Sequence, residues 1–87
     1  MARSRPRHPG EVLLRDFLDA KGISQNALAR DLGVPPRRIN EIVLGKRGIS
    51  ADTALRLAKR FGNSARFWMQ LQADFDLEQA RKAFAET

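Results

Sequence analysis

The sequence contains no cysteine and only one histidine, His8. Without cysteine the chain has no disulfide, no thiolate nucleophile and no cysteine-ligated zinc or iron–sulfur centre. His8 lies in a tract of prolines and arginines over residues 3–9, where nothing would hold an imidazole in place as a general base. We therefore expect that the protein is not an enzyme and that it has no catalytic residue, no cofactor and no metal site.

Long apolar runs are also absent. No stretch approaches the roughly 18 residues that a membrane span requires, and the basic N-terminal residues lack the apolar segment of a signal peptide. With 87 residues the chain is long enough for one domain and too short for two. These features predict one cytoplasmic domain that has neither a membrane nor a small-molecule substrate as its partner.

Positive charge is what the sequence has in excess. Sixteen lysines and arginines against ten acidic residues give a formal net charge of +6. The positive charge is concentrated in residues 1–10 and 34–66, whereas residues 11–33 and 67–87 are slightly acidic. An uneven basic charge of this kind favours a polyanionic partner such as nucleic acid.

The apolar residues recur at helical spacing, and the segments are separated by serines and glycines. The first helix is predicted over about 11–20. The following helices are predicted between Ser24 and Gly33, from Pro35-Pro36 to just before Gly45, between Ser50 and Gly62, and from Ser64 onward. Leu77, Ala80 and Phe84 either continue the last helix or form a short sixth one. The predicted fold is all-α, a compact five- to six-helix bundle.

Residues 24–43 have the pattern of a helix-turn-helix. Ala29 is small enough for two helix backbones to cross, and Gly33 tolerates the positive φ of a three-residue turn. The spacing of the apolar residues packs both helices on the rest of the bundle through Leu28, Leu32, Val34, Ile39 and Ile42. The alternative is an ordinary helical hairpin, which the strongly polar face of the second helix disfavours.

That polar face carries side chains suited to reading base edges. Arginine pairs with guanine and asparagine with adenine, and recognition helices present such residues from their first turns. We predict base contacts from Pro36, Arg37, Arg38 and Asn40, the proline through a thymine methyl group. Phosphate contacts are predicted from Gln25, Arg30, Lys46 and Arg47. The alternative for Arg37 and Arg38 is a surface ion pair with Glu41.

Both ends of the chain differ in character from this central motif. Residues 1–8, with Arg3, Arg5 and Arg7, are predicted to form a flexible basic arm that either enters a minor groove or only increases solubility. Residues 9–87 then form the helix-turn-helix domain, which ends in a helical dimerisation segment. A homodimer interface is predicted at Phe75, Leu77 and Phe84, with core packing as the alternative. For Trp68 and Leu71 core packing is preferred.

Beyond the motif, the chain resembles the HigA/VapI group of antitoxins within the Xre-type, lambda-repressor-like helix-turn-helix superfamily. The resemblance covers about residues 8–78, and it is most specific at His-Pro-Gly-Glu-Val-Leu (8–13) and Phe-Trp-Met-Gln-Leu-Gln (67–72). It implies a homodimer that represses its own operon at a palindromic operator and neutralises a HigB-like toxin, an mRNA-cleaving ribonuclease of the RelE type. The arginine-rich extension before His8 departs from the family pattern. A stand-alone regulator of transcription without a toxin, and a protein-interaction adaptor, are the alternatives.

The acidic flanks suggest where such a toxin would dock. A protein that holds RNA must itself be basic, so acidic surfaces complement it. The acidic residues concerned are Glu11, Asp16 and Asp19 in the first helix, and Asp74, Asp76 and Glu78 near the C-terminus. The recognition helices would then remain free to bind DNA.

Overall fold

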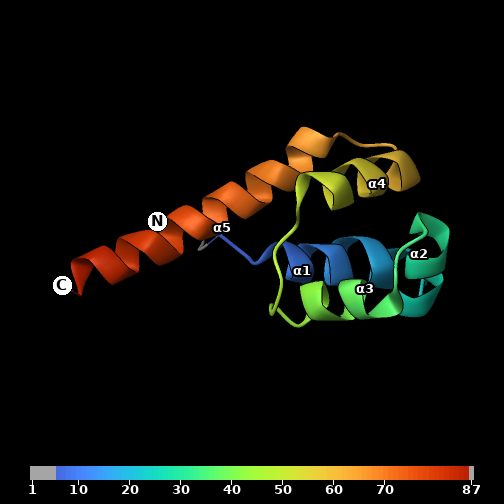
Figure 1. Ribbon diagram of the computed structural model, residues 1–87, viewed down its shortest axis with the longest axis horizontal. Helices are drawn as coiled ribbons and strands as arrows, with labels where there is room; N and C mark the ends of the chain where they lie inside the picture. Colours follow the sequence, from blue (N-terminus) through green and yellow to red (C-terminus); the bar gives the residue numbers. More distant parts are fainter. Residues whose placement is uncertain (1–5, 87) are drawn as a thin grey trace.

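Every element of the computed structural model is helical over the residues that it describes, 6–86 (Figure 1). The helix α1 (Pro9–Val12) continues directly into the π-helical segment η1 (Leu13–Asp19). Then follow α2 (Gln25–Leu32), α3 (Pro36–Val43), α4 (Ala51–Phe61) and α5 (Ala65–Ala85). The all-α prediction is confirmed, and Leu77, Ala80 and Phe84 belong to α5 rather than to a sixth helix. Among these residues no helix combines the length and apolar character needed to cross a membrane.

The helix ends follow the local sequence signals. The side-chain oxygens of Ser24, Ser50 and Ser64 accept hydrogen bonds from backbone N–H groups in the first turns of α2, α4 and α5. At the other end of α2 and α4 stand Gly33 and Gly62, with φ of 72° and 73°. Glycine adopts this left-handed conformation at low cost because it has no Cβ. The predicted starts of α2, α4 and α5 are therefore confirmed.

The first helix begins earlier than its predicted start at about 11. His8 is its N-cap, because the Nδ1 atom accepts a hydrogen bond of 2.9 Å from the Gly10 N–H, and Pro9 occupies the first turn. The His8 ring also packs edge-on against Phe75 of α5, with 4.8 Å between ring centroids. His8 is thus part of the folded domain, in contrast to its predicted place in a flexible arm over residues 1–8. Arg3 and Arg5 of that predicted arm lie outside the described residues.

The core lies where α2, α3 and α4 meet the first helix and the beginning of α5. The predicted apolar contacts of the helix-turn-helix are all buried, at Leu28, Leu32, Val34, Ile39 and Ile42, and so is Ala29. Trp68 is fully buried as predicted, with its indole N–H donating to the Asn63 Oδ1 at 3.0 Å. Leu71 is partly buried against this core.

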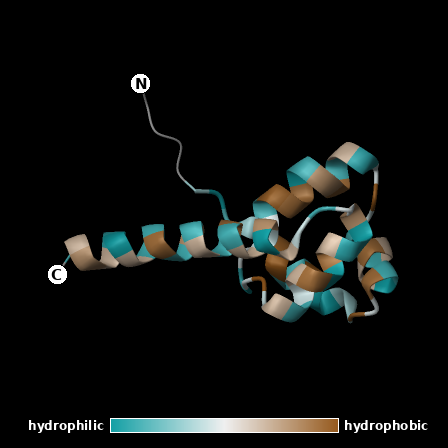
Figure 2. Cartoon of the chain, turned by 90° about the horizontal axis from the view of Figure 1, so that it is seen from above, coloured by the Kyte–Doolittle hydropathy of each residue, from teal (hydrophilic) through white to brown (hydrophobic). Residues whose placement is uncertain are grey.

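The second half of α5 extends away from the bundle (Figures 1 and 2). The molecule measures 42 × 27 × 21 Å along its principal axes. Phe75 is half-buried because it contacts His8, whereas Leu77 and Phe84 are 52% and 84% exposed. These three residues therefore lie on or beyond the edge of the bundle, and the homodimer interface predicted from them stays a prediction.

Gly10 is the point where the first helix approaches α3 most closely. A Cβ atom built on Gly10 would lie 1.7 Å from the carbonyl oxygen of Ile42, which belongs to the backbone and cannot rotate away. We predict that Gly10→Ala lowers the free energy of unfolding by roughly 3 kcal/mol, the upper part of the range for overpacking. Urea denaturation followed by circular dichroism measures this loss.

The matched control for this substitution is Gly22→Ala. Gly22 has a φ of +67° and nothing within 4 Å of a built Cβ, so alanine there costs only the backbone strain, about 1–2 kcal/mol. Equal losses in the two variants would contradict the close approach of the first helix to α3.

The cap formed by His8 predicts a pH-dependent stability. Burial lowers the pKa of His8 below its ordinary value of 6.5, although the negative charge of Asp76 acts in the opposite direction. The unfolded chain therefore binds a proton more readily than the folded one. The stability that depends on neutral His8 is present above pH 6.5 and is lost as the pH falls through 6.5 towards the folded-state pKa.

The variant His8→Asn tests this dependence, because asparagine caps a helix equally well and does not titrate. We expect its melting temperature to change less than that of the natural chain between about pH 8 and pH 5. Glu41 and Asp52, whose pKa values are lowered, stay ionised over this range. The same pH profile in both proteins would show that His8 is not the responsible group.

Candidate nucleic-acid interface

The helices α2 and α3 form the predicted helix-turn-helix. α2 ends at Leu32, residues 33–35 form the turn, and α3 begins at Pro36 with Pro35 as its N-cap. A backbone hydrogen bond of 3.0 Å from the Val34 N–H to the Ala29 carbonyl closes the turn. Because Val34 is buried, the turn is fixed to the core, and this fixes the direction in which α3 leaves it.

α3 buries one side and exposes the other. Ile39 and Ile42 are 0% exposed, while Pro36 and Arg37 are exposed and Arg38, Asn40 and Glu41 are half-buried. With 3.6 residues per turn, Arg37 and Glu41 lie at the centre of the open side. Arg38 and Asn40 lie on its two edges, because Arg38 contacts α4 and Asn40 contacts α2. The four predicted base-reading residues therefore all lie in the first two turns of α3 and outside the core.

Asn40 is joined to the start of α2. Its Nδ2 atom donates a hydrogen bond of 2.7 Å to the Oε1 atom of Gln25. Gln25 is the first residue of α2, where the unpaired backbone N–H groups make the helix end electropositive. A hollow of about 370 Å³ lies beside this pair and is bordered in part by Ser24 and Asn26. A predicted base reader and a predicted phosphate ligand are thus brought together at one edge of α3.

Glu41 lies between two of the predicted DNA-binding arginines. Its Oε2 atom accepts a hydrogen bond of 2.9 Å from the Arg37 Nε, and its Oε1 atom accepts one of 3.0 Å from the Arg47 Nε. These bonds, that from Arg37 first and that from Arg47 next, hold the pKa of Glu41 below its ordinary value. The Arg37 side chain nevertheless remains 85% exposed. The ion pair with Glu41 that was the alternative for Arg37 does form, and it leaves the arginine accessible.

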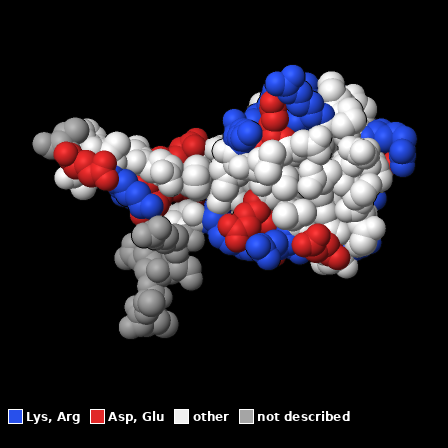
Figure 3. All heavy atoms as spheres, turned by 90° about the horizontal axis from the view of Figure 1, so that it is seen from below, with Lys and Arg blue, Asp and Glu red and all other residues white. Residues whose placement is uncertain are grey.

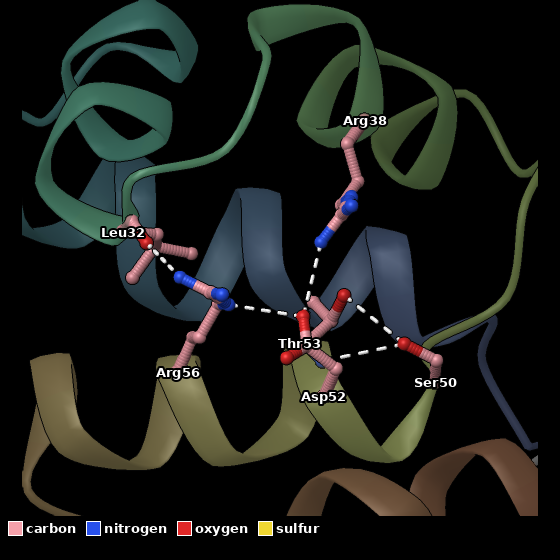
Figure 4. A network of polar contacts seen from close by, with 6 residues as sticks. All are labelled: Leu32, Arg38, Ser50, Asp52, Thr53 and Arg56. Carbon is pink, nitrogen blue, oxygen red and sulfur yellow. Dashed lines mark hydrogen bonds and ion pairs between the residues drawn. The ribbon is translucent and has the colours of Figure 1, made fainter.

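Arg38 makes a different contact from the one that its spacing suggested. Its Nη1 atom lies 3.1 Å from the Oδ2 atom of Asp52 in α4, not against Glu41 (Figure 4). The same carboxylate oxygen accepts a hydrogen bond of 2.9 Å from the Arg56 Nε. The bond from Arg56, and less strongly that from Arg38, lowers the pKa of Asp52. The spacing of four residues between Asp52 and Arg56 is typical of an ion pair within a helix. No pattern in the sequence indicates that Asp52 also contacts Arg38.

The remaining predicted phosphate ligands are exposed and lie in α2 or just after α3. Arg30 is exposed in α2, and Lys46 and Arg47 are exposed in the segment that follows α3. Seen from below relative to Figure 1, the molecule carries its lysines and arginines in separate clusters at the edges, several with acidic atoms beside them (Figure 3). On this face the basic groups therefore lie around a mostly uncharged centre, with acidic atoms beside several of them (Figure 3).

The family, sequence and structure comparisons all match this chain to helix-turn-helix proteins or their relatives. The pattern of the helix-turn-helix family matches residues 14–68. Virulence-associated protein I of Dichelobacter nodosus is 51% identical over 75 residues, which are 86% of this chain and 69% of that protein. The antitoxin HigA of Pseudomonas aeruginosa, solved with the higBA promoter, has a TM-score of 0.90 and 49% identity, covering 94% of this chain and 89% of that one. The antitoxin GraA in complex with its operator has a TM-score of 0.88 and 41% identity, covering 99% and 87%.

Proposed function

Because the chain belongs to the helix-turn-helix family, with relatives of the HigA and VapI type, we propose that it is a sequence-specific repressor that binds operator DNA through α3. The observation that carries the proposal is the open side of α3. Arg37, Arg38 and Asn40 lie in its first two turns, and Asn40 contacts Gln25 at the electropositive start of α2. Two similar structures contain promoter or operator DNA, and the likeness covers most of both chains.

In this function α3 enters the major groove. Pro36, Arg37, Arg38 and Asn40 face the base edges, while Gln25, Arg30, Lys46 and Arg47 contact phosphates on either side. Arg37, whose side chain is 85% exposed, exchanges its ion pair with Glu41 for contacts to DNA, whereas Arg38 keeps its contact to Asp52 and binds DNA through its other N–H groups. Exposed ion pairs contribute little to stability, so this exchange costs little. The proposal includes no catalytic activity and no cofactor, and binding to an operator implies a cytoplasmic protein.

We propose that two copies bind a palindromic operator. One recognition helix covers only a few base pairs, so a dimer that places two helices about 34–36 Å apart reads a longer site. The part of α5 beyond the bundle, with the half-buried Phe75 and the exposed Leu77 and Phe84, is the proposed contact between the copies.

We further propose that the protein is an antitoxin that binds a HigB-like, mRNA-cleaving toxin and represses the operon that encodes both. The acidic residues suited to a basic partner differ in how far they are neutralised. Asp16 pairs with Arg7 at 2.8 Å, and Glu11 lies 3.6 Å from Arg15. On the α5 flank, Glu78 lies 4.0 Å from Arg81, but Asp74 and Asp76 accept hydrogen bonds from the uncharged amides of Gln70 and Gln72. The α5 flank therefore keeps more of its negative charge, which favours it as the docking surface for the toxin.

The division between base readers and phosphate ligands predicts two kinds of mutant. Arg38→Ala and Asn40→Ala should each weaken operator binding by about 1–3 kcal/mol and leave binding to random DNA almost unchanged. Lys46→Ala should weaken both equally and reduce the slope of log K against log salt by about 1. Fluorescence anisotropy with the DNA upstream of the gene and a scrambled duplex measures both effects. A loss in Arg38→Ala that is the same on the two duplexes would contradict its role as a base reader.

Separate surfaces for DNA and toxin predict a separation of functions. The double variant Arg37→Ala/Arg38→Ala should fail to repress transcription and should still protect cells that express the toxin encoded beside the gene. Circular dichroism confirms that the variant is folded. Loss of protection in the folded variant would show that the surfaces overlap, and absence of a neighbouring toxin gene would identify a stand-alone regulator.

A further inference from the structure

The recognition helix is connected to α4 and to the end of α2 through a chain of polar contacts, here called the Asp52 relay (Figure 4). It begins at the backbone carbonyl of Leu32, the last residue of α2, which accepts a hydrogen bond of 2.8 Å from the Arg56 Nη1. The Nε atom of Arg56 donates to Asp52 at 2.9 Å, and Asp52 accepts from the Nη1 of Arg38 at 3.1 Å. The relay thus joins α2, α4 and α3.

The two ends of the relay differ in how firmly they are held. Arg56 donates through two nitrogens, one to Asp52 and one to a backbone carbonyl, so its guanidinium plane is fixed. Asp52 lies in the first turn of α4, where a negative charge is favourable. Among residues 6–86, Arg38 by contrast makes one side-chain hydrogen bond, through Nη1. Asp52 is therefore a fixed acceptor that orients Arg38 and leaves its other N–H groups available.

Arg38 is also the more restrained of the two arginines that begin α3. Its side chain is 30% exposed, against 85% for Arg37. A bidentate contact to guanine requires the guanidinium to lie in the plane of the base edge. A contact to phosphate has no such requirement, and any sequence provides it. Holding Arg38 in one orientation therefore favours contacts to bases over contacts to phosphates.

We propose that Asp52 is a specificity-determining residue, which positions Arg38 for base reading and lowers affinity for DNA of other sequences. The inference rests on the proposed function, since it assigns Asp52 a role in the same interface. Two effects combine. The carboxylate orients Arg38, which raises affinity for the operator relative to other DNA, and its negative charge lies at the edge of the DNA-binding side, where it lowers affinity for the phosphates of every duplex.

The substitution Asp52→Asn removes the charge and keeps the shape of the side chain. We expect it to tighten binding to random DNA severalfold and to lower the ratio of operator affinity to random-DNA affinity by about tenfold. Fluorescence anisotropy with operator and scrambled duplexes at one salt concentration measures the ratio. Thermal unfolding of each variant confirms that the proteins compared are folded.

The matched control is Asp31→Asn. Asp31 accepts a hydrogen bond of 3.1 Å from the Arg60 Nε, so it too forms an exposed ion pair that joins α2 to α4, without contact to α3. The control removes the same charge and should leave the affinity ratio unchanged. If the ratio in Asp52→Asn equals that in Asp31→Asn, the proposal is overturned, because net charge alone then explains the result.

A second comparison establishes whether Asp52 acts through Arg38. In the Arg38→Ala background, Asp52→Asn should have no further effect on the affinity ratio. A further fall of the ratio in that background overturns the positioning role. In the free protein, NMR relaxation of the Arg38 Nε–Hε group should show a less ordered side chain in Asp52→Asn, and equal order in both proteins also overturns it.

The outcomes separate this inference from the proposed function. If the natural chain binds its upstream DNA no better than scrambled DNA, the proposed function is wrong and the inference falls with it. If the natural chain discriminates, and Asp52→Asn discriminates equally well, only the inference is wrong.

Discussion

The contact between the first helix and α3 at Gly10 determines how the rest of the molecule is arranged. A Cβ at Gly10 would collide with the Ile42 carbonyl, so the two helices lie at a distance that only glycine permits. This close approach allows Ile39 and Ile42 to be completely buried, and their burial decides which side of α3 faces solvent. The arginines of α3 face solvent because Ile39 and Ile42, on the opposite side of the same helix, are buried.

On and beside that open side, two carboxylates each lie between two arginines. Glu41 is held between Arg37 and Arg47, and Asp52 between Arg38 and Arg56. Like charges at such spacing repel one another, and an intervening carboxylate reduces the repulsion in the free protein. A net charge of +6 favours binding to a polyanion, and in the proposed interface the two carboxylates would make the attraction differ from place to place. In the proposed interface, affinity and selectivity would therefore depend on different residues of the same small surface.

Most of the fold could be predicted from the sequence because its signals are local. A serine that caps a helix acts within three residues, and a glycine that ends one acts through its own φ angle, so Ser24, Gly33 and Ser64 could be recognised by inspection. The burial of Ile39 and Ile42 follows from helical periodicity in the same way. The π-helical geometry of Leu13–Asp19 has no comparable signal, because the segment contains neither glycine nor proline.

Two side-chain contacts that sequence reasoning missed depend on residues far apart in the chain. The prolines and arginines around His8 predict a flexible arm. In the structure Phe75, which lies 67 positions further along the chain, packs against the His8 ring. Arg38 was considered as a partner of Glu41, the nearest carboxylate along the helix, whereas the folded chain brings Asp52 to it from α4. Only the assembled bundle decides which of two available carboxylates an arginine meets.

The same long-range arrangement makes two separate partners compatible with one small chain. α3 lies in the bundle with α2 beside it, whereas the second half of α5 extends past the bundle along the longest dimension, 42 Å (Figure 1). The half-buried Phe75 marks the place where α5 leaves the bundle, because it still contacts His8 while Leu77 is already 52% exposed. The distal part of α5, where a protein partner is proposed to bind, is therefore a different element from the one that carries Arg37. The proposed binding of DNA and of a second protein therefore uses two different helices of the same chain, α3 and α5.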